Sequence, residues 1–438
     1  MTAAALDPQT KPQVDLVKTY RKITLHLVPF LFICYLFNYF DRVNVGFAKL
    51  RMLETLHISE TQYGLAAGIF FIGYVVCGIP SNLILYKVGA RRLLAVSLIL
   101  WGLFSTSLMF VTSAKSFYVI RFLTGVSEAG FFPGIILYFT LWFPLAQRGR
   151  IISLFIAAIP ISGVLGSPFS GWILHAFSSG IGGLASWQWL FLIQGLPTVL
   201  LGVLMMFLLN DSIGQAKWLS AEEKSAVLQA LRDDDRNRPK DVPDSFIRVL
   251  GNSRVWVLGV IYFCLVCGLY MLSFWMPSII RTSGVKDPLS IGWLSAIPYL
   301  ISSVFMVLVG RSADARHERR WHLVVPIMMG VVGLVIAANF ASSTLVAMIG
   351  LTIASMGIFA ALPMFWPVTS AFLTASAAAG GIALINSLGN SSGFFSPYLV
   401  GWIKDVTHST DLALYILAGA MLVGMVLVLR IPGKVVNR

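Results

Sequence analysis

Twelve apolar segments dominate this sequence and restrict it to folds that cross a lipid bilayer. Each runs for about 20 residues or more, which is enough to cross a ~30 Å hydrocarbon core as a helix. Such a segment crosses as a helix because its backbone polar groups then bond within the segment. Charged residues form only 12% of the chain, against about 25% in soluble proteins. We therefore predict transmembrane helices at residues 24–47, 62–86, 93–111, 117–142, 149–177, 187–209, 253–281, 289–310, 322–341, 344–368, 376–402 and 411–430.

The most hydrophilic stretch, residues 210–252, divides these segments into six and six. This arrangement is typical of two repeated halves with a substrate path between them near the midplane of the membrane. We expect an all-α membrane protein with two six-helix bundles, 23–209 and 253–430, around a central cavity. Residues 1–22 and 431–438 are expected to be tails, and residues 210–252 a central loop.

The distribution of lysine and arginine predicts the orientation of the chain. The net charge of +13 would suggest nucleic-acid binding in a soluble protein, but here the positive-inside rule accounts for it. With the N-terminus inside, short cytoplasmic loops and tails hold 16 Lys and Arg residues, and the outer loops hold six. We therefore expect both termini in the cytoplasm, the lipid bilayer as a partner, and no nucleic acid.

Four charged residues lie well inside the predicted spans: Asp41 and Arg42 in the first, and Arg121 and Glu128 in the fourth. Charge in the hydrocarbon region is costly, so such residues indicate a functional site. From the helical rise, Asp41 lies about 21 Å and Arg121 about 24 Å above the inner edge of the membrane. We therefore expect Asp41 to pair with Arg121. Glu128 lies two turns farther along, near the midplane, and Arg42 leaves its helix about 100° from Asp41.

These residue types suggest separate roles in the transport of an anion. Arg42 is the candidate ligand of a substrate carboxylate, because a planar guanidinium suits bidentate recognition. Asp41 and Glu128 are candidate proton carriers, because burial and a nearby arginine have opposite effects on a carboxyl pKa. Arg121 would be the counter-ion that Asp41 releases on protonation. The alternative is a static Asp41–Arg121 pair that only fixes the packing of two helices.

Further candidates for the cavity wall are uncharged. Aromatic side chains of membrane helices are usually packing or belt residues, and buried amides can bond a substrate or a neighbouring helix. With those alternatives open, the candidate substrate-binding residues are Tyr39 and Tyr74 in the first half, and Tyr270, Phe274, Trp275, Trp366, Asn386 and Asn390 in the second.

Two tight basic turns occupy matching positions in the two halves. Lys87, Gly89 and Arg91 follow the second span, and Gly310, Asp314 and Arg316 follow the eighth. They resemble the loop motif G-x-x-x-D-[RK]-x-G-R-[RK] of the major facilitator superfamily. Asn82 and Tyr86 depart from that motif in the first half, which weakens the cytoplasmic gating latch that the resemblance implies there.

The resemblance extends over residues 20–430 and includes five motifs in order. It is closest to the anion:cation symporter branch, which includes phthalate, tartrate and galactonate permeases and sialin-type carriers. Its members use matching charged positions for carboxylate binding and proton coupling, which implies these roles for Arg42, Asp41 and Glu128. The motifs are Asn38–Asn44, Ile79–Asn82, Arg121–Gly130, Ser273–Pro277 and Asn386–Asn390.

We therefore predict a proton-coupled symporter that takes up a small organic carboxylate, a sugar acid, tartrate-like diacid or aromatic acid, as a monomer in a bacterial inner membrane. The alternatives are proton/drug antiport, which two intramembrane arginines disfavour, and uncoupled facilitation of an organic anion. An enzyme is disfavoured because no H-E-x-x-H or G-x-S-x-G motif occurs. A sensor without transport would need a signalling domain. No cofactor is expected, and no metal, because the histidines do not cluster and Cys264 and Cys267 form a lone C-x-x-C pair.

Overall fold

The computed structural model describes residues 14–236, 249–373 and 375–437, and every regular element in them is helical. Three short 3-10 turns lie at Leu108–Phe110, Ile181–Gly183 and Ile213–Gln215. The α-helices are α1 Leu16–Leu56, α2 Glu60–Val88, α3 Ala90–Ser107, α4 Ala114–Glu128, α5 Phe131–Trp142, α6 Leu145–Ile156, α7 Ala158–Ala176, α8 Ser186–Leu208, α9 Ala221–Arg236, α11 Ser253–Thr282, α12 Pro288–Arg316, α13 Trp321–Asn339, α14 Thr344–Phe372, α15 Ala375–Thr407, α16 Asp411–Leu429 and α17 Gly433–Val436.

Each predicted span coincides with a helix or with two consecutive helices. Eleven of the described helical segments are long and apolar enough to cross a membrane, and the predicted span 376–402 lies within α15. The central loop contains α9, but residues 237–248 of it lie outside the described part of the chain. Residues 1–13 and 438 of the predicted tails also lie outside it.

Two predicted spans are each divided into two helices. The fourth span ends its first helix at Glu128 and resumes at Phe131, after the turn at Ala129 and Gly130. The fifth span is divided at Ala157 between α6 and α7. The hydropathy of these segments runs across both breaks, which is why the sequence predicts one span in each case. The first break places Glu128 at the end of a helix rather than in its middle.

Local signals explain where the longest helix begins and where the chain turns. The Asp15 carboxylate accepts hydrogen bonds from the N–H groups of Val17 and Lys18, which caps the start of α1. At the other end His57 adopts a left-handed conformation, and Ser59 forms a capping box with Gln62. The chain therefore reverses between α1 and α2 within three residues.

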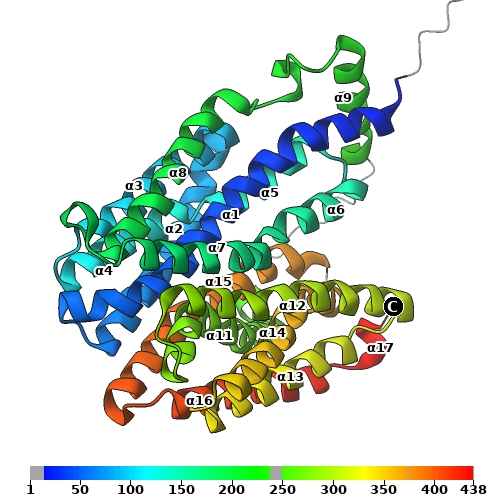
Figure 1. Cartoon of the computed structure of the whole chain (residues 1–438). Helices are drawn as coiled ribbons and strands as arrows, with labels where there is room; N and C mark the ends of the chain where they lie inside the picture. The colour runs from blue at the N-terminus through cyan, green and yellow to red at the C-terminus, as the bar shows by residue number, and fades with distance from the viewer. Residues whose placement is uncertain (1–13, 237–248, 374, 438) are drawn as a thin grey trace, which may run out of the picture.

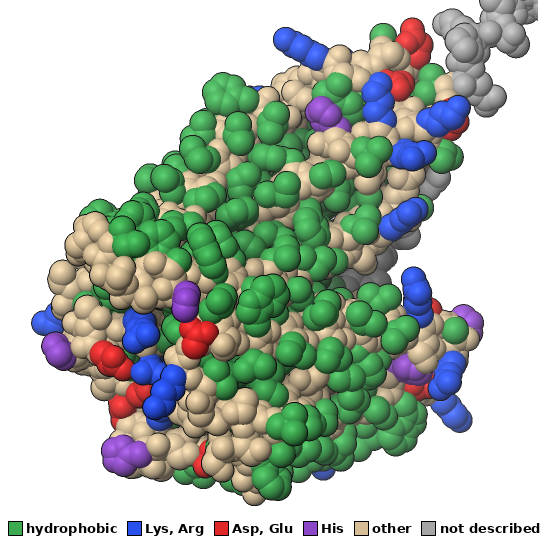
Figure 2. Space-filling model, viewed as in Figure 1, with side chains coloured by type: hydrophobic (Ala, Val, Ile, Leu, Met, Phe, Trp, Pro, Cys, Tyr) green, Lys and Arg blue, Asp and Glu red, His purple; other side chains and the backbone are tan. Residues whose placement is uncertain are grey.

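The helices form two groups, drawn one above the other in Figure 1. Helices α1–α9 make the upper group and α11–α17 the lower group, and both ends of the described chain lie at the right of the view with α9. Figure 2 shows the surface hollowed between the two groups at that end, and a mainly apolar band between two ends where charged side chains gather. Large apolar side chains such as Leu200, Leu300 and Val304 are exposed, as expected of a protein with a lipid-facing surface.

At the opposite end the two groups are in close contact. Helix α2 crosses α15 so closely that a Cβ at Gly64 would lie 2.3 Å from the carbonyl oxygen of Pro397. Helix α7 meets α12 through Gly171 and Gly292, where added Cβ atoms would also overlap the facing backbone. The molecule is thus closed at the end away from the termini.

Candidate functional site

A buried ion pair lies between the two candidate helices of the first half. The Arg42 guanidinium, from α1, donates through Nη2 to Oε1 of Glu128 at the end of α4. Both side chains are at least nine-tenths buried. A buried charge requires a partner, and each of these two residues supplies it for the other.

Aromatic rings surround the guanidinium of Arg42. Its Cζ atom lies 4.8 Å from the ring centroid of Tyr39 and 5.5 to 6.0 Å from those of Phe70, Tyr74 and Phe71. Rings at these distances attract a cation electrostatically, and they exclude water from it. This set of Arg42, Glu128 and the four rings is called the central cage below. It brings together four predicted site residues of the first half: Arg42, Glu128, Tyr39 and Tyr74.

Asp41 faces away from this cage, toward α3. Its Oδ1 atom accepts hydrogen bonds from the Ser105 hydroxyl at 2.9 Å and from the Asn44 amide at 3.2 Å. Among the described residues, nothing donates to its buried Oδ2 atom, and the buried indole N–H of Trp101 on α3 has no acceptor there either. The carboxyl is therefore held in a dry polar site with one oxygen able to carry a proton.

The predicted pairing of Asp41 with Arg121 is wrong in this structure. Arg121 instead donates to the backbone oxygens of Ala66 and Ala67 at 3.4 and 3.5 Å and lies over the Phe70 ring, 4.7 Å from its centroid. Similar depth does not decide the partner; the direction around α1 does. Asp41 points to α3, and it is Arg42, one residue on, that points to α4.

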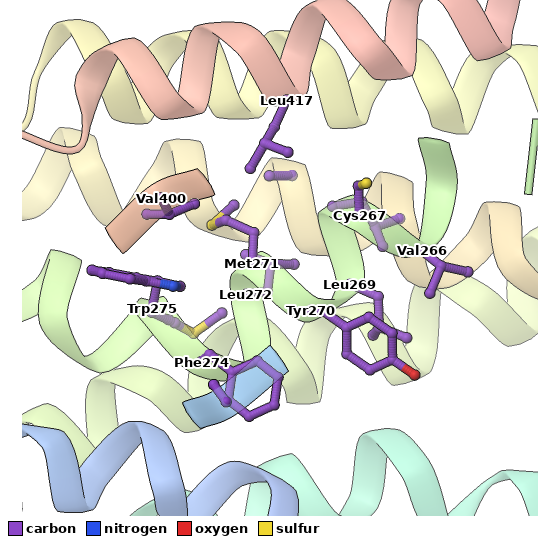
Figure 3. Close-up of a cluster of buried hydrophobic side chains, with 14 of the residues drawn as sticks. Val266, Cys267, Leu269, Tyr270, Met271, Leu272, Phe274, Trp275, Val400 and Leu417 are labelled. Atoms are coloured by element: carbon purple, nitrogen blue, oxygen red, sulfur yellow. The ribbon is translucent and has the colours of Figure 1, made fainter. Parts of the chain in front are cut away.

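The opposite wall of the site comes from α11 and α15. The Tyr270 hydroxyl donates to Oδ1 of Asn390 at 2.9 Å, and the Asn390 amide donates to Oδ1 of Asn386 at 3.2 Å. The Tyr270 ring also contacts Phe71 of the central cage, with 4.2 Å between centroids. Figure 3 shows Tyr270 and Phe274 projecting to the same side of α11. Both amides thus have protein partners, and Tyr270 links them to the cage.

Two other predicted wall residues lie elsewhere. Trp366 packs against Tyr262 and Phe365, within its own half. Trp275 is fully buried at the closed end, where its ring meets that of Tyr63 edge-on. Neither ring is among those that contact Arg42.

The predicted gating loops differ in how they are held. The Arg91 guanidinium forms an ion pair with Asp211, 3.2 Å from Nε to Oδ2, which ties the first turn of α3 to the chain just after α8. Lys87, Asp314 and Arg316 are exposed at helix ends, and Gly310 is half-buried; in the described part of the chain these residues form no ion pair. Asp211 was not singled out in the sequence, because its partner lies 120 residues away.

An ionic cluster that was not predicted from the sequence lies at the closed end. Glu60 lies between two lysines from different halves, with Nζ of Lys49 2.6 Å from one carboxylate oxygen and Nζ of Lys404 2.6 Å from the other. Lys49 is buried, with its Nζ 3.3 Å from the Trp275 ring centroid. The predicted first span ends at residue 47, so Lys49 is expected in a loop. In the structure α1 continues to Leu56, and the spacing of seven residues puts Lys49 and Arg42 on one face of it.

Asp405 completes this cluster. It accepts hydrogen bonds from the backbone N–H and the hydroxyl of Thr61 at 2.7 and 2.5 Å, across the boundary between the halves. Burial raises the pKa of Asp405, but the hydrogen bonds from Thr61 outweigh it and leave that pKa below its usual value. The carboxylate therefore stays charged at neutral pH.

Comparison with known proteins identifies the family. Residues 31–397 match the family model of the Major Facilitator Superfamily. The chain belongs to this superfamily. Its fold also matches the inward-open xylose transporter XylE from E. coli, with a TM-score of 0.73, 15% identity and coverage of 94% of this chain and 96% of that one.

Curated relatives of this superfamily member are transport proteins. It is 45% identical to a Pseudomonas putida protein that bears the name of a metabolite transport protein, NicT, over 96% of this chain and 95% of that one. It is 44% identical to an Agrobacterium vitis protein named for tartrate transport, over 94% and 91%. A quinolone resistance transporter of Acinetobacter baumannii is 37% identical over 93% of both chains. The protein is thus a multi-pass membrane transport protein rather than an enzyme.

Proposed function

We propose that this protein couples the uptake of a small organic carboxylate to an inward flow of protons. The observation that carries the proposal is the central cage: a buried guanidinium among aromatic rings whose ion-pair partner is a carboxylate of the protein itself. A substrate carboxylate can take the place of Glu128 on Arg42 if Glu128 is protonated. Binding of the anion and binding of the proton then favour each other.

In this mechanism each residue has one task. Arg42 holds the substrate carboxylate, Glu128 takes a proton as it leaves Arg42, and Asp41 carries a second proton in the site formed by Ser105 and Asn44. Arg121, held by two backbone carbonyls, keeps a positive charge near both acids. Tyr270, Asn386 and Asn390 would bond the hydroxyl or second carboxyl groups of the substrate. The tartrate-related sequence supports hydroxylated diacids as the first class to test.

We further propose that the termini lie in the cytoplasm of a bacterium, as the lysine and arginine distribution predicts. The closed end is then the outer end and the structure is inward-open. The halves 23–209 and 253–430 would move as units about the site, with Arg91 and the loop at Gly310–Arg316 acting at the inner end. The path runs within one chain, so a monomer suffices.

The test is uptake into proteoliposomes of labelled tartrate, galactonate and benzoate, with and without an inward proton gradient. We expect one acid to accumulate above its outside concentration only when the gradient is present. Equilibration without accumulation would mean an uncoupled facilitator.

The quinolone-related sequence supports a second candidate, proton/drug antiport. In the same vesicles, an antiporter would extrude a labelled quinolone against its gradient while protons enter. We expect no such extrusion, because in the proposed mechanism the protons enter together with the bound acid and in the same direction.

Leucine at Gly64 should keep the outer end from closing. Its side chain would begin at a Cβ only 2.3 Å from Pro397, whereas at Gly78 on the same helix a Cβ meets nothing within 4 Å. With a cysteine in place of Leu53 as the reporter, Gly64→Leu should increase the rate of labelling by a membrane-impermeant maleimide from outside about tenfold. Gly78→Leu is the control, and equal rates for both variants would contradict an outer gate at this crossing.

A further inference from the structure

The outer end carries two cations of the second half that are held by carboxylates of the first half. Arg281, at the end of α11, lies 3.0 Å from Oε1 of Glu54 on α1, and it also donates to the backbone oxygen of Leu50 at 2.6 Å. Lys404, near the end of α15, lies 2.6 Å from Oε1 of Glu60 on α2. Both contacts must break when the two halves separate at this end.

We propose that Arg281 and Lys404 form an outer capture site for the substrate carboxylate, and that Glu54 and Glu60 occupy it while the outer end is closed. This inference rests on the proposed transport of organic anions. It assigns an anion-binding site to the second half, which the central cage does not provide.

The two cations belong to one concave surface. A cavity of about 430 Å³ at the outer end is lined by both, together with Lys49, Glu54, Glu60 and Ser278. This volume is within the range of small-molecule sites. A small acid can therefore reach both cations from the outside in the same place.

When the outer end opens, the charges that remain on each half decide which half binds the anion. Glu60 stays with Lys49, since both belong to the first half and Lys49 is buried against it. Arg281 and Lys404 leave with the second half and lose their carboxylates. Asp405 leaves with them, but adjacent residues on a helix point about 100° apart, so it does not replace Glu60 on Lys404. Among the residues that line the cavity, the charged side chains of the second half are the two cations Arg281 and Lys404, which favours an anion from solution.

Each ion pair can be broken by a substitution at the cation or at the carboxylate. The two substitutions have different effects if the cation binds substrate and the same effect if it only closes the gate. Arg281→Met removes a cation of the capture site, whereas Glu54→Gln removes only the group that occupies it. If Arg281 only closes the gate, both variants break the same contact and change the KM in the same direction. If it captures the substrate, the KM for outside acid rises in Arg281→Met and falls in Glu54→Gln.

The experiment measures the KM for labelled tartrate, or for the acid accumulated in the panel above, in right-side-out and inverted membrane vesicles. For Arg281→Met we expect the KM to rise about fivefold in right-side-out vesicles and to stay unchanged in inverted ones. The difference in KM from the unaltered protein should disappear at high salt. Lys404→Met and Glu60→Gln repeat the comparison at the second contact, and Lys115→Met removes an exposed lysine at the same end as a control.

The outcomes distinguish this inference from the function on which it rests. Shifts of KM in the same direction for Arg281→Met and Glu54→Gln, with uptake by the unaltered protein intact, would overturn the capture site alone. Failure of the unaltered protein to transport any acid of the panel would overturn both.

Discussion

Alanine in place of Arg42 is expected to lower kcat/KM for carboxylate uptake about 100-fold. The guanidinium is the cation of the central cage, and loss of one partner of a buried charged pair costs about 2–5 kcal/mol, where 1.4 kcal/mol is tenfold. Arg42→Lys should recover only part of the loss, because an ammonium lacks the planar fork that binds a carboxylate through two donors. Uptake of the labelled acid into proteoliposomes measures each variant.

Two controls separate binding from folding in this experiment. Arg51→Ala removes an exposed arginine of the same helix and should leave uptake unchanged. Arg42→Ala combined with Glu128→Gln removes both charges, so no unpaired acid remains buried; the protein should be stable but inactive. Full uptake by the double variant would show that Arg42 does not bind substrate.

Asparagine in place of Asp41 should reduce accumulation to the level that one proton can drive, but leave exchange of labelled for unlabelled acid. The amide keeps the shape of the side chain and its bond to Ser105, but it cannot carry a proton. One pH unit is worth about 1.4 kcal/mol per proton, or about tenfold in concentration. Because Glu128 still carries one proton, the accumulation ratio under an inward gradient of one pH unit should fall about tenfold, while counterflow persists.

Asp233→Asn is the matched control, because this exposed acid on α9 lies outside the candidate site. It should accumulate substrate normally. Accumulation unchanged from the unaltered protein in Asp41→Asn would leave Glu128 as the coupling acid and reduce Asp41 to packing. Loss of counterflow as well would indicate that Asp41 is needed for the motion itself.

The family and the helices could be predicted because hydropathy and motif spacing are local in the sequence. The boundaries of α8 and α11 agree with the predicted spans within a residue, since polar or turn residues flank them. The break after Glu128 was not visible, because Ala129 and Gly130 interrupt the helix without interrupting its apolar character. Sequence therefore predicts where the chain crosses the membrane better than where it turns within it.

The sequence singled out four charged residues that are buried in the structure, but it did not predict which of them pair. All four charged residues lie in the buried interior of the first half, yet Arg42 pairs with Glu128 and Asp41 bonds to Ser105. Which way a helix faces depends on packing against α3 and α4, and single-sequence patterns do not contain that rotation. Lys49 was missed for a related reason: α1 continues to Leu56, so a residue assigned to a loop is in fact on a helix.

The Arg42–Glu128 pair also determines how the carrier responds to voltage. Asp41, Arg42, Arg121 and Glu128 carry two negative and two positive charges, so the empty interior is electrically neutral when both acids are ionised. Moving one charge through a membrane potential of 100 mV is worth about 2.3 kcal/mol. The movement of a neutral interior carries no net charge through that potential. Return of the empty carrier should then be independent of voltage. A monoanion taken up with two protons would carry one positive charge inward, so the membrane potential would drive the loaded step alone.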